Sequence, residues 1–212
     1  MFKITDNALK SIKEFFEKEL LILFGEQECK SLFKLACEGI LNTPYSKPID
    51  YEIRLSESEV LQFFNLIKRL KNNEPIQHIL TYAFFYDLKL KVNKDVLIPR
   101  QETEELVHLA IQFLKQNETA TVLDLCTGSG CIALALKKNY PKANVHALEL
   151  SNSALSIAQE NALELNLAIT FNQLDVLDLN TLKTKYQANS VDLVISNPPY
   201  IPTAQWTQLP AD

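Results

Sequence analysis

Asp124-Leu-Cys-Thr-Gly-Ser-Gly130 is the stretch that decides the fold of the second half of this chain. It follows a short apolar run and holds two of the four glycines in the 212 residues. Glycine after a strand lets the backbone turn tightly and approach a ligand, and the N-terminus of a following helix adds unpaired amide donors. The stretch therefore predicts a strand, a ligand-binding loop and a helix in succession.

Segments on both sides of this loop alternate between strand and helix patterns. Short apolar runs predict strands at 121–125, 145–150, 168–173 and 191–196. Amphipathic segments predict helices at 102–114, 132–138 and 154–165. This alternation is typical of an α/β domain with a doubly wound, Rossmann-like parallel sheet, whose ligands bind at the carboxyl ends of the strands.

The first part of the chain has a different pattern. Between residues 5 and 71, apolar residues recur at helical spacing in three segments, and Ser56 with Glu59 forms a capping box for the third. From Ile79 to Leu97 apolar and polar residues alternate, which predicts a β-hairpin. We therefore expect a small all-α domain at 1–75, a β-hairpin linker at 76–98 and a catalytic domain at 99–212.

The composition is that of a globular protein, with 47% apolar and 22% charged residues. The longest wholly apolar stretch, Leu20–Phe24, is too short for a membrane span, and no signal-like segment opens the chain, so we expect a cytoplasmic protein. Residues 96–212 hold 7 basic and 12 acidic residues and so the whole net charge of −5, which argues against a nucleic-acid partner. The four cysteines lack zinc-ligand spacing, so neither a metal nor a disulfide is expected.

A second motif, Asn197-Pro-Pro-Tyr200, directly follows the apolar run Val191–Ser196. By itself it also fits a plain turn after a buried strand. The side-chain oxygen of Asn197 and the carbonyl of Pro198 are two acceptors that can hold the two hydrogens of an amide or aromatic amine nitrogen. Such a nitrogen is too weak a nucleophile to attack unaided. The motif therefore indicates a transferase that acts on it.

Two kinds of cofactor fit the glycine loop. Glu149 ends the next predicted strand, where a carboxylate can accept hydrogen bonds from both ribose hydroxyls of an adenosine cofactor. The run Gly128-Ser-Gly-Cys-Ile-Ala133 also matches the dinucleotide pattern, so a nicotinamide cofactor is an alternative. Asp124 favours a ligand with an amino group, such as S-adenosylmethionine, over a pyrophosphate. Asp175, after the third strand, is expected to accept from the adenine amine or to be a solvated helix-start acid.

At these residues the chain resembles the class I S-adenosylmethionine-dependent methyltransferases, and more closely the PrmC/HemK family of peptide chain release factor glutamine N5-methyltransferases. The resemblance rests on the order of the helical domain, Glu74–His78, the hairpin, Leu97–Glu105, the glycine loop and Ser196–Tyr200. Cys126 departs from it, because a glycine is common there; we expect it to narrow the loop's conformations without abolishing binding. Gln101 replaces a frequent proline, which makes the following helix start less rigid.

The resemblance implies methyl transfer from S-adenosyl-L-methionine to the side-chain amide nitrogen (N5) of the glutamine in the Gly-Gly-Gln motif of a release factor. The implied catalytic residues are Asn197, Pro198, Pro199 and Tyr200, and these bind the substrate together with Arg100. The candidate cofactor-binding residues are Asp124, Cys126, Thr127, Gly128, Gly130, Glu149, Leu150, Asp175, Val176 and Asn197.

Three alternatives stay open at this point. The segment Pro99–Glu105, which contains Arg100, also fits a plain helix start whose acids complement the helix dipole. The protein could methylate an amino group of adenine (N6) or guanine (N2) in nucleic acid, against which stands the negative charge of the catalytic half. It could also be an inactive cofactor-binding scaffold, against which stands the intact Asn-Pro-Pro-Tyr turn.

The resemblance also implies an incomplete sheet, because family members continue after this turn with further helices and strands. The strand at 191–196 would then be left as an apolar edge. Such an edge invites pairing with another chain. We expect a chain that ends at Asp212 to be less stable, prone to self-association and poorly active.

Overall fold

The computed structural model describes residues 6–115 and 119–199. The chain divides into two compact units, Met1–Thr81 and Tyr82–Asp212. The boundary falls inside the segment that we expected to be a linker, and the hairpin belongs to the second unit. Within the described residues, no helix is long and apolar enough to cross a membrane.

Helices form the first unit: α1 (Leu9–Leu41), α2 (Glu57–Lys71) and α3 (Ile76–Leu80). Gly25 interrupts α1 with φ 75° and ψ 173°, so α1 consists of two helical segments, as the sequence pattern predicts. The predicted capping box of Ser56 and Glu59 is present at the start of α2. The largest fully buried side chains of this unit are Phe16, Phe63, Leu9, Ile12, Leu20 and Leu70.

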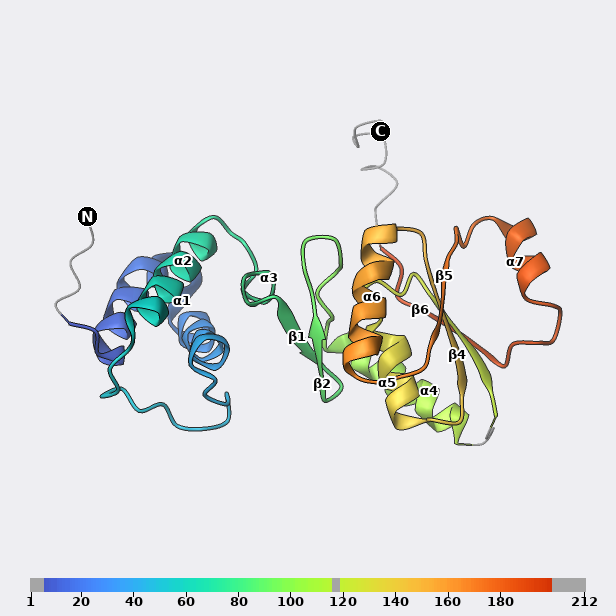
Figure 1. The fold of residues 1–212 in the computed structure, drawn as a ribbon, viewed down its shortest axis with the longest axis horizontal. Helices are drawn as coiled ribbons and strands as arrows, with labels where there is room; N and C mark the ends of the chain where they lie inside the picture. The colour runs from blue at the N-terminus through green and yellow to red at the C-terminus, as the bar shows by residue number, and fades with distance from the viewer. Residues whose placement is uncertain (1–5, 116–118, 200–212) are drawn as a thin grey trace, which may run out of the picture. The chain divides into compact units, whose positions relative to one another are not determined.

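A parallel four-stranded sheet forms the centre of the second unit (Figure 1). Its strands are β3 (Thr121–Leu125), β4 (Asn144–Glu149), β5 (Thr170–Gln173) and β6 (Leu193–Ser196). They lie in the order β5-β4-β3-β6, so the chain runs outward from β3 in one direction and returns to add β6 on the other side. The strand order thus reverses between β3 and β6, which makes the carboxyl ends of these two strands the expected ligand site. The predicted α/β fold is confirmed.

Helices cover both faces of this sheet: α4 (Glu102–Leu114), α5 (Cys131–Asn139), α6 (Asn152–Glu164) and α7 (Leu179–Lys185). Figure 1 shows α5 and α6 on one side of the strands and α7 on the other. The sheet face on the side of α5 and α6 contributes Val122, Ala147 and Ile195 to the main apolar core. No apolar stripe in the sequence predicts α7, and none of its residues is buried in the structure.

The hairpin consists of β1 (Tyr82–Phe85) and β2 (Leu88–Lys91). Its turn residues Tyr86 and Asp87 both have positive φ, 48° and 59°, as a type I′ turn requires. The backbone N–H of Tyr86 donates to Glu104 Oε1 of α4 at 2.8 Å. The hairpin is therefore attached to the helix that precedes the sheet.

β6 is an edge strand among the described residues, since it pairs with β3 alone. Its side chains differ sharply in exposure: Ile195, which belongs to the main apolar core, is 4% exposed, whereas Val194 is 56% exposed. Val194 is therefore an exposed apolar side chain on this strand, and the expected pairing of the edge with another chain stays a prediction.

Candidate functional site

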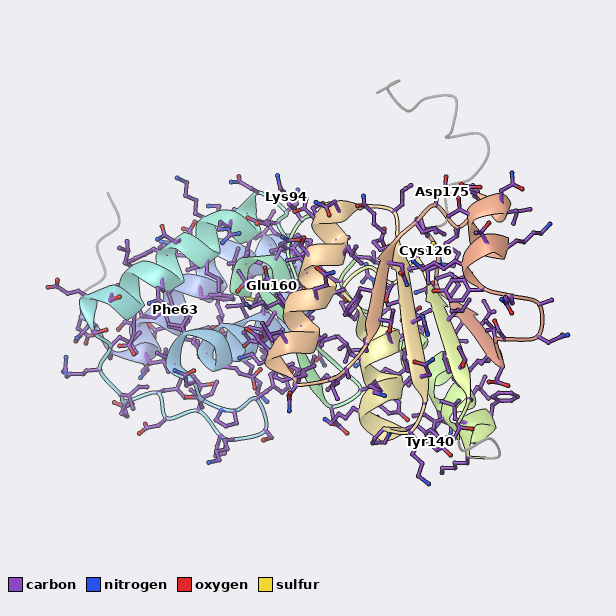
Figure 2. All side chains as sticks on the ribbon, turned by 45° about the vertical axis from the view of Figure 1, so that its right-hand side comes forward. Phe63, Lys94, Cys126, Tyr140, Glu160 and Asp175 are labelled. Carbon is purple, nitrogen blue, oxygen red and sulfur yellow. The ribbon has the colours of Figure 1, made fainter. Side chains whose placement is uncertain are left out.

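A cleft of about 1270 Å³ opens at the carboxyl ends of the parallel strands. Figure 2 shows Cys126 and Asp175 at this end of the sheet and Tyr140 at the opposite end. The predicted site residues that line the cleft are Arg100, Cys126, Gly128, Glu149, Leu150, Asp175, Val176, Asn197, Pro198 and Pro199. Asp124, Thr127 and Gly130 are not among its lining residues, and Tyr200 lies outside the described residues.

Asp124 lies beneath the glycine loop and not in the cleft. Its side chain is fully buried, and Oδ2 accepts from Thr127 Oγ1 at 2.5 Å and from the Ala133 N–H at 3.2 Å. Burial raises the pKa of Asp124 to about 7, although both hydrogen bonds act to lower it. In this structure Asp124 ties the loop to the start of α5, and its contact with a cationic ligand stays a prediction.

The loop residues Cys126, Gly128 and Gly130 all have positive φ, 57°, 56° and 82°. A Cβ atom at Gly130 would lie 3.2 Å from the Cβ of Ala158 on α6, whereas one at Gly128 would meet nothing within 4 Å. Gly130 is thus required both by its backbone conformation and by close packing on α6. Cys126 occupies the left-handed region with a full side chain, which strains its backbone.

We expect Cys126→Gly to raise the free energy of unfolding by about 0–1.5 kcal/mol. Removal of the left-handed strain raises the free energy of unfolding by about 1–2 kcal/mol. The greater freedom of glycine in the unfolded chain lowers it by about 0.5–1 kcal/mol. Urea denaturation measures the difference, with Cys126→Ala as a control that keeps the strain. A glycine variant less stable than the alanine variant would contradict this account.

Glu149 is held at the cleft wall by three backbone amides. Its Oε2 accepts from the Gly128 N–H at 2.9 Å, and its Oε1 accepts from the N–H groups of Leu150 and Ser151 at 2.9 and 3.1 Å. Each carboxylate oxygen can accept two hydrogen bonds, so Oε2 retains capacity for a ligand hydroxyl. Asp175 is arranged similarly, with Oδ1 accepting from the Leu177 N–H at 2.9 Å.

The cleft also contains residues that are not among the predicted site residues. Asp95, Val96 and Leu97 come from the segment after the hairpin, and Thr103 and Leu106 come from α4. The hairpin and this segment form a small apolar cluster with α6 through Ala83, Val92, Val96 and Ala154. Leu97 and Thr103 lie in the segment Leu97–Glu105 that carries the family resemblance, whereas no local pattern marks Asp95 and Val96, which packing brings to the cleft.

Asn197 directly follows β6 and is held from two sides. The Ser196 hydroxyl donates to the Leu125 carbonyl at 2.8 Å, which ties the end of β6 to the end of β3. The Asn197 Nδ2 donates to Thr103 Oγ1 at 3.0 Å. Nδ2 of Asn197 therefore already has a hydrogen-bond partner. Oδ1 is the atom of this amide that can accept hydrogen bonds.

The charge of the cleft is predominantly negative. Its ionisable lining residues are Arg100 on the positive side and Asp95, Glu102, Glu149 and Asp175 on the negative side. Such a site favours a ligand that carries positive charge and disfavours the pyrophosphate of a dinucleotide. Among the described residues, no group of three or more His, Cys, Asp or Glu side chains could hold a metal ion.

Each of the two units of this chain is similar in sequence to proteins of a known family. Residues 101–209 match the family model "Methyltransferase small domain" and residues 46–80 match "PrmC N-terminal domain". The release factor glutamine methyltransferase of Bacteroides thetaiotaomicron is 37% identical over 96% of this chain and 72% of its own length. That of Flavobacterium psychrophilum is 36% identical over 91% of this chain and 67% of its own length.

A solved structure, the tRNA (uracil-54, C5)-methyltransferase of Pyrococcus abyssi in complex with S-adenosyl-L-homocysteine, is also similar. It is 18% identical, with a TM-score of 0.43, and the match covers 56% of this chain and 28% of that one.

Proposed function

This chain belongs to the release factor glutamine methyltransferase family, and we propose on that basis that it methylates the side-chain amide nitrogen (N5) of the glutamine in a Gly-Gly-Gln motif. The methyl donor is S-adenosyl-L-methionine, and the protein substrate is a peptide chain release factor. One observation carries the proposal: Asn197 and Glu149 line the same cleft, at the carboxyl ends of β6 and β4. A single cavity can therefore hold the cofactor and the amide that it methylates.

The residues present fit S-adenosyl-L-methionine. Glu149 offers the remaining acceptor capacity of Oε2 to a ribose hydroxyl, and Asp175 offers its carboxylate to the adenine amine. The apolar side chains of Leu150 and Val176, on the same wall, suit the adenine ring. When bound, the cofactor supplies a methyl group on a positively charged sulfur, which the acidic cleft stabilises.

The proposed chemistry depends on hydrogen-bond acceptors. The Oδ1 of Asn197 and the carbonyl of Pro198 accept the two hydrogens of the glutamine amide, so that its nitrogen lone pair points at the methyl group. No strong base is required before transfer, because the cationic N-methylated amide that forms is acidic and afterwards loses one proton to a carbonyl or to water. Positioning of this kind offers on the order of 7–11 kcal/mol. Acceptors that bind the developing positive charge better than the neutral amide add to it.

Glu149→Ala is expected to weaken binding of S-adenosylhomocysteine by about 1.5–3 kcal/mol, because charged hydrogen bonds to the ribose are lost. Isothermal calorimetry measures the change, with NAD as a second ligand that we expect not to bind. Glu160→Ala, at an exposed position on α6, is the matched control. Unchanged affinity in Glu149→Ala, or tighter binding of NAD than of S-adenosylhomocysteine, would refute the cofactor assignment.

The experiment that tests the function offers all substrates at once. The protein is incubated with S-adenosylmethionine labelled in its methyl group, a bacterial-type release factor and total RNA, and the labelled product is identified by mass spectrometry. Label on the Gly-Gly-Gln glutamine supports the proposal. Label in RNA favours the amino-directed nucleic-acid alternative, and cofactor binding without any transfer favours a scaffold role.

The proposal also assigns a role to each unit. The helical residues 1–75 are assigned to recognition of the release factor, and residues 99–212 to the cofactor and the chemistry. Release factors act in translation, so the proposed location is the cytoplasm.

A further inference from the structure

We propose that Thr103 is a positioning residue that sets the orientation of the Asn197 side-chain amide for methyl transfer. The two residues are 94 positions apart, and Asn197 Nδ2 donates to Thr103 Oγ1 at 3.0 Å. Both line the cleft. The chemical consequence rests on the function proposed above, whereas the contact itself does not.

The orientation matters because the two ends of a side-chain amide have nearly the same shape and opposite hydrogen-bonding character. The substrate nitrogen carries two hydrogens and needs acceptors. When Oδ1 of Asn197 faces the substrate nitrogen, its contact with the hydrogens of that nitrogen is attractive. With the amide rotated by half a turn, Nδ2 would direct its own hydrogens at those of the substrate. Only one of the two orientations therefore supports catalysis.

Thr103 is well placed to hold Asn197 in that orientation because its own backbone is fixed. It is 7% exposed, and its N–H donates to the Arg100 carbonyl at 3.1 Å in the first turn of α4. The next residue, Glu104, accepts from the Tyr86 N–H of the hairpin at 2.8 Å. On the other side, the bond from Ser196 to Leu125 holds the backbone before Asn197. In this arrangement Oγ1 of Thr103 accepts from Nδ2 of Asn197, so Oδ1 is turned away from Thr103.

Thr103→Val removes the hydroxyl and keeps the branched shape, whereas Thr103→Ser keeps the hydroxyl. We expect Thr103→Val to lower kcat for methylation of a release factor by about 5- to 30-fold, the scale of one hydrogen bond, and Thr103→Ser to retain most of the wild-type kcat. KM for the release factor, affinity for S-adenosylhomocysteine and the thermal unfolding midpoint should change little in both. Thr184→Val on α7 is the matched control, because that exposed hydroxyl donates only to the Asn180 carbonyl.

A second measurement does not depend on activity. The side-chain ¹⁵N–¹H signals of Asn197, assigned by their loss in Asn197→Ala, should shift in Thr103→Val and stay near their wild-type positions in Thr103→Ser. Full turnover or unshifted Asn197 signals in Thr103→Val would overturn the inference. Equal loss of kcat in both variants, with a lower unfolding midpoint, would overturn it in favour of a packing role. A wild-type protein that fails to methylate the release factor would instead overturn the proposed function.

Discussion

Asn197→Ala is expected to lower turnover by roughly 10² or more, the scale for removing one preorganised transition-state contact. The variant loses the Oδ1 acceptor, so one hydrogen of the substrate amide is no longer held and the nitrogen lone pair is no longer aimed at the methyl group. The side chain also loses its bond to Thr103, but the backbone remains tied through Ser196 and Leu125. Cofactor affinity should therefore stay almost unchanged.

Single-turnover methylation of a release factor measures this effect, since it separates the chemical step from product release. Calorimetry with S-adenosylhomocysteine verifies that the cofactor site is intact. Asn180→Ala, at an exposed position on α7, is the matched control and should be fully active. Full activity in Asn197→Ala would show that the Asn-Pro-Pro-Tyr turn is only structural.

Asn161→Leu is expected to lower the free energy of unfolding by about 3–5 kcal/mol, the range for breaking a buried hydrogen-bond network. Asn161 is 1% exposed on α6, and its side chain joins the hairpin to the glycine loop. Its Oδ1 accepts from the Lys91 N–H at 2.6 Å, and its Nδ2 donates to the carbonyls of Lys91 and Ser129 at 3.1 and 2.9 Å. Leucine has a similar size but leaves all three backbone groups without this partner.

Urea denaturation of the wild-type and variant proteins measures the loss. Glu160→Leu is the matched control, because it places the same side chain at the neighbouring exposed position and should change stability by less than about 1 kcal/mol. Because Ser129 belongs to the cofactor loop, Asn161→Leu should also weaken S-adenosylhomocysteine binding. A variant as stable as Glu160→Leu would show that the hairpin and the loop are held by other contacts.

Residues at strand ends were the most predictable part of the candidate site. β3 has the bounds that the apolar run at 121–125 predicts, and Glu149, Asp175 and Asn197 line one cleft, as expected for residues that follow parallel strands. Chain direction alone accounts for this, because the carboxyl ends of parallel strands meet at one edge of the sheet. The hairpin and the capping box of α2 were predictable for a similar reason, because each depends on residues that are close together in the sequence.

The sequence by itself therefore determined the α/β class, the parallel strands, the glycine loop and the polar groups at the strand ends, since each depends on spacing along one segment. The tertiary structure alone decided that Asp124 is buried beneath the loop, that Asn161 joins the loop to the hairpin, and that Thr103 meets Asn197. The physical reason is common to all three. Each depends on a hydrogen bond or on burial between segments that packing brings together, and such a contact leaves no periodic pattern in either segment.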